Sequence, residues 1–133
     1  MSDKGDVVDL DEAPTVKDDA SFTQALEDAG YQVRHGERTG GPFFSAPGQI
    51  VHVADAQLQV FEYPTRAALA DDRSSIGLRG DTVPTKDGGI AIVQWAGPPH
   101  FFSSGKLLVL YFGDRPVVLE ALSLLLGTPF AGR

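Results

Sequence analysis

The segment of residues 106–112 restricts the folds open to this chain more than any other. It reads KLLVLYF, and after its lysine every residue is apolar. An uninterrupted apolar run of this length is typical of a strand that is covered on both faces. The rigid turn Gly97-Pro98-Pro99 and the aromatic pair Phe101-Phe102 come just before it. We therefore predict that residues 106–112 form a central strand of a sheet.

Three segments have the spacing of an amphipathic helix. In the first, Ser21 and Gln24 have the spacing of a capping box, and apolar residues recur at helical intervals until a glycine ends the pattern. In the second, Thr65 follows a proline and caps the helix. The third has the strongest apolar stripe, with Asp114 as its cap and Gly127 at its end. The predicted helices cover about residues 21–29, 66–73 and 115–126.

The remaining patterned segments are short and have the spacing of strands. They cover residues 31–35, 43–45, 50–53, 57–63, 90–96 and 106–112. Short links between successive strands favour antiparallel pairing. The order of the elements predicts an α+β domain, with an antiparallel sheet of about six or seven strands and three helices packed mainly on one face. Residues 74–89 contain four glycines and a proline and are predicted to be the longest loop.

Residues 43–53 and 101–110 resemble each other. Each begins with Phe-Phe-Ser, continues through a tight turn and ends in an apolar run with strand character. Two interpretations stay open: a degenerate internal duplication, or two hairpins that share the same turn and strand preferences. The second is simpler, because it needs no common origin.

Acidic residues are concentrated at the beginning of the chain. Seven of the 18 acidic residues lie in the first 19 positions with only two lysines, so this part carries −5 of the formal net charge of −7. Such a segment has too few apolar residues to offset the chain entropy lost on folding. We predict a disordered acidic tail or tether at residues 1–17 and a single α+β domain at residues 18–133.

Charge and composition exclude several functions. A net charge of −7 opposes binding to nucleic acid or to an anionic membrane surface. No apolar run is long enough to span a membrane and the chain does not start like a signal peptide, so as given it is expected to be soluble. Without cysteine it has no disulfide, thiolate metal ligand or cysteine nucleophile.

His100 is the strongest single candidate for catalysis, since it lies between Pro99 and Phe101 at the entrance to the predicted central strand. An enzyme would need a partner for it, and the sequence contains no Gly-x-Ser-x-Gly, His-Glu-x-x-His or phosphate-loop motif. A hydrogen bond to a backbone group of the turn explains this histidine more simply. We therefore assign no catalytic residue, and keep a small hydrolase or metal-dependent enzyme centred on His100 as the alternative function.

A metal site would draw on His35, His52 and His100, with Glu37 or Glu62 as a further ligand. The spacing gives no support, because His35 and His52 fall on different predicted strands and no paired His-x-His occurs. The aspartates of the acidic tail lack the spacing and the glycine of a calcium loop. No metal ligand and no cofactor are assigned.

Aromatic residues are numerous for a core of this size, and they supply the candidate binding site. Successive residues of a strand face opposite ways, so one member of Phe43-Phe44 and one of Phe101-Phe102 points away from the main core unless it is covered. An exposed aromatic patch beside Pro98-Pro99 would bind a peptide, a partner protein or an apolar ligand. The residues assigned to this site are Trp95, His100, Phe101, Phe102 and Tyr63.

Several of these segments resemble a group of uncharacterised small bacterial lipoproteins. The similarity covers about residues 20–133, and its most specific part is Pro98-Pro99-His100-Phe101-Phe102. The other segments that carry it are residues 26–30, Pro42-Phe43-Phe44, Gly48, Val60-Phe61-Glu62-Tyr63, residues 105–113, Leu125-Leu126-Gly127 and Phe130-Ala131-Gly132. In that group the domain follows a signal peptide, a lipid-modified cysteine and a polar linker. The group supplies no activity and no catalytic residues to carry over.

These features together predict a non-catalytic ligand- or partner-binding domain of a bacterial envelope lipoprotein or exported protein. The resemblance implies association with the cell envelope, with the acidic start as the tether. If Met1 is the native start, a cytoplasmic domain is expected instead. The binding partner is expected to be a protein or a small ligand, without nucleic acid.

Overall fold

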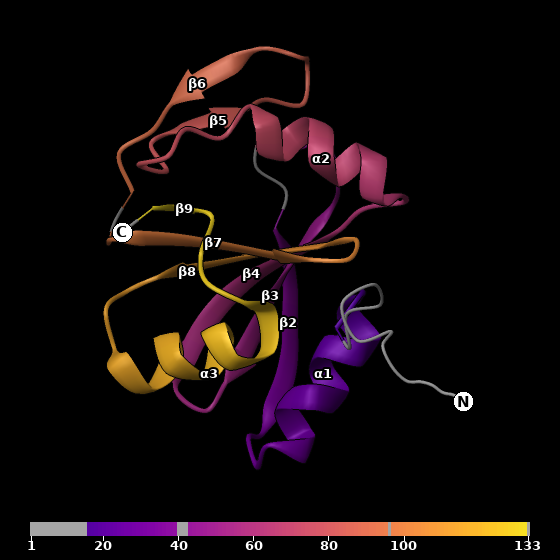
Figure 1. Cartoon of the computed structure of the whole chain (residues 1–133), viewed down its shortest axis with the longest axis vertical. Coiled ribbons are helices and arrows are strands. Elements are labelled where there is room, and N and C mark those ends of the chain that lie inside the picture. Colours follow the sequence, from indigo (N-terminus) through magenta and orange to yellow (C-terminus); the bar gives the residue numbers. More distant parts are fainter. Residues whose placement is uncertain (1–15, 40–42, 96, 133) are drawn as a thin grey trace, which may run out of the picture.

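The computed structural model of the chain describes residues 16–39, 43–95 and 97–132. These residues form three helices, a six-stranded antiparallel sheet and a separate two-stranded sheet, which confirms the predicted α+β class. The six-stranded sheet is the middle layer, and other elements pack on both of its faces (Figure 1). Residues 1–15 of the predicted tail lie outside the described residues.

The large sheet places the most apolar strand in its interior. Its strands are β2 (Val33–Thr39), β3 (Gly48–Val53), β4 (Ala56–Glu62), β7 (Pro99–Ser104), β8 (Leu107–Phe112) and β9 (Ala131–Gly132). They lie in the order β2-β3-β4-β8-β7-β9, and every neighbouring pair is antiparallel. The predicted central strand is therefore confirmed as β8, which pairs with β4 on one side and with β7 on the other.

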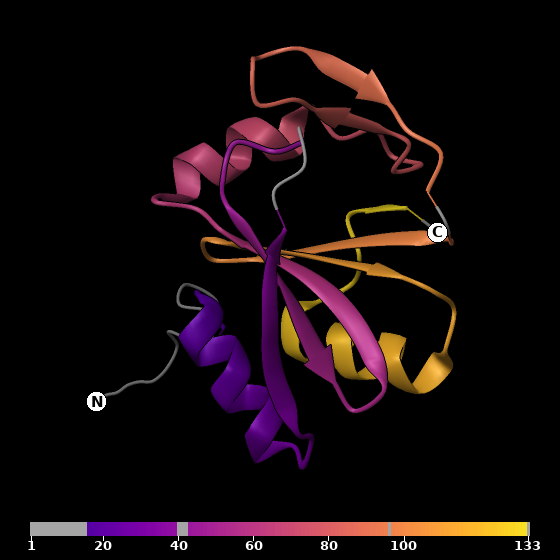
Figure 2. The same ribbon diagram turned by 180° about the vertical axis from the view of Figure 1, so that it is seen from behind.

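Helices lie on both faces of this sheet. Their bounds are Asp19–Asp28 for α1, Arg66–Ser74 for α2 and Pro116–Leu126 for α3. The first and third cover one face, whereas α2 lies over the other face together with a hairpin of β5 (Thr82–Pro84) and β6 (Ile90–Ile92) (Figures 1 and 2). The expectation of helices mainly on one face thus holds for two of the three.

Two apolar cores result, one on each face, and β8 contributes to both. Leu107, Val109 and Tyr111 belong to the core under α1 and α3. Leu108 and Leu110 belong to the core under α2 and the hairpin. All five side chains are at most 4% exposed, which explains why this strand has no polar residue on either face.

Two of the three predicted helix N-caps are wrong. Asp18, rather than Ser21, is the N-cap of α1; the Asp18 carboxylate accepts hydrogen bonds from the backbone N–H and the hydroxyl of Ser21, at 2.9 and 2.7 Å. The N-cap of α3 is Arg115 rather than Asp114, and it makes no side-chain capping bond. The predicted cap of α2 is confirmed, because the Thr65 hydroxyl accepts a hydrogen bond from Ala68 N.

The packed part of the chain already includes residues 16 and 17. Val16 is 1% exposed and lies in the core under α1 and α3. The carbonyl of Lys17 accepts a hydrogen bond from Lys106 N, and that of Val16 accepts one from the Ser104 hydroxyl, so both residues lie against the turn between β7 and β8. These contacts begin two residues before the predicted domain start at Asp18.

The segment at residues 43–45 is not the strand that the sequence predicts. Phe43 makes only an isolated bridge to Thr85, and Phe44 has a positive φ of 66°. Its counterpart in the internal similarity, Phe101-Phe102, is in the regular strand β7. The two similar segments therefore differ in backbone course, although each leads into a strand.

The loop predicted at residues 74–89 contains β5, which pairs with β6. The strand predicted at residues 90–96 is shorter and consists of β6 alone. Among the described helices, none is both long enough and apolar enough to cross a lipid bilayer.

Candidate functional site

Three members of the predicted aromatic site are core residues. Phe101 and Phe102 are neighbours on β7 and therefore point to opposite faces, where each is fully buried in one of the two cores. Tyr63 is 1% exposed and lies in the core under α2. Because both faces of the sheet are covered, these three side chains do not form a surface that a partner can reach.

His100 lies on β7 and contacts the turn that follows β8. Its Nε2–H donates a 2.7 Å hydrogen bond to the carbonyl of Gly113, and its ring stacks on that of Tyr111 with 6.1 Å between the centroids. The residue is 4% exposed and, within the described chain, its Nδ1 has no hydrogen-bond partner. Among those residues no serine or carboxylate hydrogen-bonds the imidazole, so the described chain supplies no partner of the kind that general base catalysis uses.

The three histidines considered as metal ligands do not converge. His35 lies opposite Val51 and His52 lies opposite Arg34 in the β2–β3 pairing, so the two side chains point to opposite faces of the sheet. The described part of the chain holds no group of three or more histidine, aspartate and glutamate side chains placed to bind a metal ion.

The remaining predicted residue, Trp95, is half-buried and lines an aromatic pocket. This pocket has a volume of about 200 Å³ and lies on the α2 side of the sheet. Its lining residues are Thr39, Phe43, Phe44, Gln59, Phe61 and Trp95. The rings of Phe44 and Phe61 are almost fully buried, while Phe43 and Trp95 are half-buried and form its outer walls.

Trp95 is held in place from two directions. Its Nε1–H donates a 2.6 Å hydrogen bond to the carbonyl of Gly80. Its ring packs against Phe112 at 4.9 Å and meets Phe43 edge to face at 5.9 Å, measured between ring centroids. An indole that is fixed in this way keeps its wall of the pocket without a ligand, and such preorganisation lowers the entropy cost of binding.

A buried carboxylate anchors the segment that follows Phe44. Asp72 of α2 is 8% exposed, and its Oδ2 accepts hydrogen bonds from Ser45 N, the Ser45 hydroxyl and the Tyr63 hydroxyl, at 2.7, 3.0 and 2.7 Å. Burial raises the pKa of Tyr63, and the adjacent Asp72 raises it further, so Tyr63 remains a hydrogen-bond donor. The bonds to Ser45 anchor the residue that follows Phe44, whose backbone is in the left-handed region.

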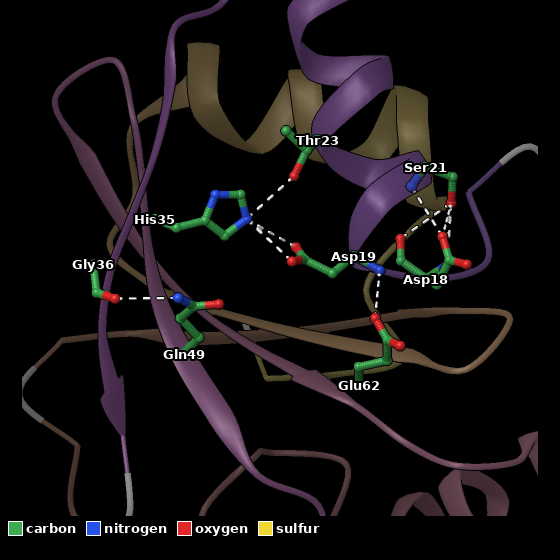
Figure 3. A network of polar contacts seen from close by, with 8 residues as sticks. All are labelled: Asp18, Asp19, Ser21, Thr23, His35, Gly36, Gln49 and Glu62. Atoms are coloured by element: carbon green, nitrogen blue, oxygen red, sulfur yellow. Dashed lines mark hydrogen bonds and ion pairs between the residues drawn. The ribbon is translucent and has the colours of Figure 1, made fainter.

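A second hollow, the polar cleft, lies on the opposite face of the same corner of the sheet. Its lining residues are Asp19, Arg38, Pro47, Gly48, Gln49, Val60 and Glu62. Glu62 accepts a 2.9 Å hydrogen bond from Asp19 N at the start of α1, and the Asp19 carboxylate accepts one of 3.1 Å from His35 Nε2 (Figure 3). Thr23 Oγ1 lies 3.3 Å from the same nitrogen.

A bulge in β2 shapes the polar cleft. His35 pairs with Val51 and Arg38 with Gln49, so three residue steps on β2 match two on β3. The extra residue places His35 and Arg38 on the same face, whereas regular alternation would place them on opposite faces. Gln49 Nε2 donates a 3.1 Å hydrogen bond to the carbonyl of Gly36 within the bulge (Figure 3).

The sequence pointed to only part of these two sites. Trp95 is among the predicted site residues, and one member of Phe43-Phe44 is expected to point away from the main core. The pocket that Phe43 forms with Trp95 depends on contacts between residues about 50 positions apart. The polar cleft was not predicted, because the bulge that creates it has no proline or asparagine signal. The single hint was Gly36 within an otherwise alternating strand. Comparison with protein-family models, curated proteins and solved structures finds no match to this chain.

Proposed function

We propose that this domain is a non-catalytic binding module, and that the aromatic pocket holds a small apolar ligand or an apolar group of a partner. The observation that carries the proposal is the set of four aromatic residues around a hollow of about 200 Å³, with Gln59 and Thr39 as the polar residues of its lining. Pockets of mainly aromatic lining with a few polar groups are typical of small-molecule sites.

The size and lining of the pocket indicate the class of ligand. A volume of about 200 Å³ accommodates a single substituted ring or a short branched aliphatic group. The polar groups of Gln59 and Thr39 fit one hydroxyl or carbonyl on that ligand. The alternative, an enzyme centred on His100, is the weaker proposal, because the imidazole bonds only a backbone carbonyl within the described chain.

The pocket can be tested through its own fluorophore, since Trp95 is the only tryptophan of the chain. Benzyl alcohol, a ring with one hydroxyl, is titrated into the protein while the emission of Trp95 is recorded. We expect a saturable change with a Kd of about 1 mM or lower. Phe43→Ala removes an outer wall and is expected to weaken binding roughly tenfold.

Phe112→Ala is the matched control for this experiment. Phe112 packs on Trp95 at 4.9 Å but does not line the pocket. It should therefore change the emission of Trp95 without changing the Kd for benzyl alcohol. A titration without saturation, or an equal loss of affinity in both variants, would show that the pocket is not a binding site. Phe101 is unsuitable for this test, because its truncation would leave a cavity in the core.

The cellular setting is part of the same proposal. The resemblance to small bacterial lipoproteins and the acidic first 19 residues support a domain tethered in the bacterial envelope. The gene sequence upstream of the Met1 codon tests this directly. An encoded apolar export segment followed by a cysteine would support envelope placement, and its absence would support a cytoplasmic domain.

A further inference from the structure

The polar cleft carries side chains of both charge signs around one small hollow. Asp19 and Glu62 contribute carboxylates, and Arg38 contributes a guanidinium. The hollow has a volume of about 180 Å³ and shares no lining residue with the aromatic pocket. The two hollows therefore have separate linings.

The positively charged side chain and the two negatively charged side chains of the cleft do not pair with one another. Within the described chain, no nitrogen of Arg38 lies within 4.0 Å of a carboxylate oxygen of Asp19 or Glu62. Surface charges of opposite sign commonly pair where their side chains can meet. Here the backbone holds Arg38 and Gln49 opposite each other across the β2–β3 pair, while Glu62 lies on β4.

Backbone and side-chain contacts hold both carboxylates in place. Glu62 Oε1 accepts the hydrogen bond from Asp19 N, which fixes that carboxylate at the start of α1 and leaves Oε2 without a partner among the described residues. The Asp19 carboxylate is held by His35 at 3.1 Å (Figure 3). The bulge that directs Arg38 toward this face is stabilised by the bond from Gln49 to Gly36. Bulges next to functional sites commonly redirect one side chain in this way.

We propose that the polar cleft binds small molecules that carry both an ammonium and a carboxylate group, the class of free amino acids and short peptides. The ammonium group binds Glu62 and Asp19, the carboxylate group binds Arg38, and Val60 forms an apolar contact beneath the ligand. An anion alone is repelled by the two carboxylates, and a cation alone leaves Arg38 unused. A ligand with both charges matches all three groups.

The test compares three probes by ¹H–¹⁵N NMR of the whole chain: L-alanine with both charges, acetate with the negative charge and methylammonium with the positive charge. L-alanine is expected to shift the backbone amides of Asp19 and Gln49 with a Kd of about 1 mM or lower. Each single-charge probe is expected to bind at least about tenfold more weakly. Glycylglycine extends the series to a longer ligand of the same class.

Two variants separate the roles of the charges. Arg38→Gln is expected to weaken L-alanine roughly tenfold and to leave methylammonium unchanged. Glu62→Gln keeps an acceptor for Asp19 N and is expected to weaken L-alanine and methylammonium alike. Arg34→Gln is the control, since Arg34 is exposed on the same strand but does not line the polar cleft.

Three results would overturn the proposal. One is the absence of saturable shifts with both L-alanine and glycylglycine. Another is binding of acetate or methylammonium as tight as that of L-alanine. The third is an equal effect of Arg34→Gln and Arg38→Gln, which would indicate general charge attraction. None of these results bears on the aromatic pocket, whose test uses a neutral probe.

Discussion

At the scale of single residues, Gly105 shows how the turn between β7 and β8 depends on the absence of a side chain. Its φ is +61°, in the left-handed region that glycine adopts without strain. A Cβ built at this position would meet the backbone of Lys17, with the carbonyl oxygen at 2.7 Å. The same turn receives the hydrogen bond between Lys106 N and Lys17 O, so the start of the described chain packs onto it.

Gly105→Ala is therefore expected to destabilise the protein in two ways. The variant acquires backbone strain at a positive φ, and it forces the Lys17 backbone away from the turn. We expect the free energy of unfolding in urea to fall by about 2 kcal/mol or more.

Gly88→Ala separates these two effects. Gly88 also has a positive φ, of +91°, but a Cβ there has no neighbour within 4 Å. The expected loss is therefore limited to strain, about 1 kcal/mol. If both variants lose the same free energy of unfolding, the overlap of the new Cβ at position 105 with Lys17 adds nothing to the cost of backbone strain.

At the scale of elements, the start of α1 depends on an ionised cap. The Asp18 carboxylate accepts two hydrogen bonds from Ser21, and the Ser21 hydroxyl in turn lies 3.1 Å from Asp18 N. These bonds hold the pKa of Asp18 below its ordinary value of 3.8, because they favour the charged form. A depressed pKa in the folded state means that the cap stabilises the protein above pH 3.8 and loses this effect as the pH falls through the lower folded value.

Asp18→Asn tests this pH dependence. Asparagine also caps helices but does not titrate, so the variant keeps much of the cap and lacks its acid transition. We expect the wild type to be more stable at roughly pH 6, and the difference in unfolding free energy to shrink as the pH is lowered to roughly 2. Urea unfolding at several pH values measures it. A difference that stays constant with pH would contradict the assignment of Asp18 as an ionised cap.

At the scale of the whole molecule, β8 contributes buried side chains to both cores, and we expect this to couple their unfolding. Leu108 and Val109 are neighbours in this strand, yet each is fully buried in a different core. Trp95 packs against the core that contains Leu108. Because β8 supplies residues to both cores, displacing this strand from one core also removes part of the packing of the other.

The variants Leu108→Ala and Val109→Ala test this coupling. Leu108→Ala is expected to cost about 2–5 kcal/mol, and Val109→Ala somewhat less. In both, the unfolding midpoint seen by Trp95 fluorescence should coincide with the midpoint seen by far-ultraviolet circular dichroism. A Val109→Ala protein in which the Trp95 signal keeps the wild-type midpoint while the dichroism shifts would show that the two cores unfold separately.

Much of the fold was predictable because local patterns determine it. The apolar run of residues 106–112 predicted a central strand, and Thr65 predicted the start of α2. Two caps were placed wrongly, at Ser21 and Asp114, because several polar residues precede each helix and the backbone geometry selects among them. Of the predicted site, Trp95 lines a pocket, while Phe101 and Phe102 are core residues on opposite faces.

The sequence by itself thus determined the class of the fold, the central strand and the approximate extent of the three helices, because hydrophobic periodicity and capping act over a few residues. Only the tertiary structure decided that α2 covers the face opposite α1 and α3, and that Phe43 joins Trp95 in the aromatic pocket. It also decided the bulge that places Arg38 in the polar cleft. These outcomes depend on pairing register and on packing between distant segments, which no local pattern encodes.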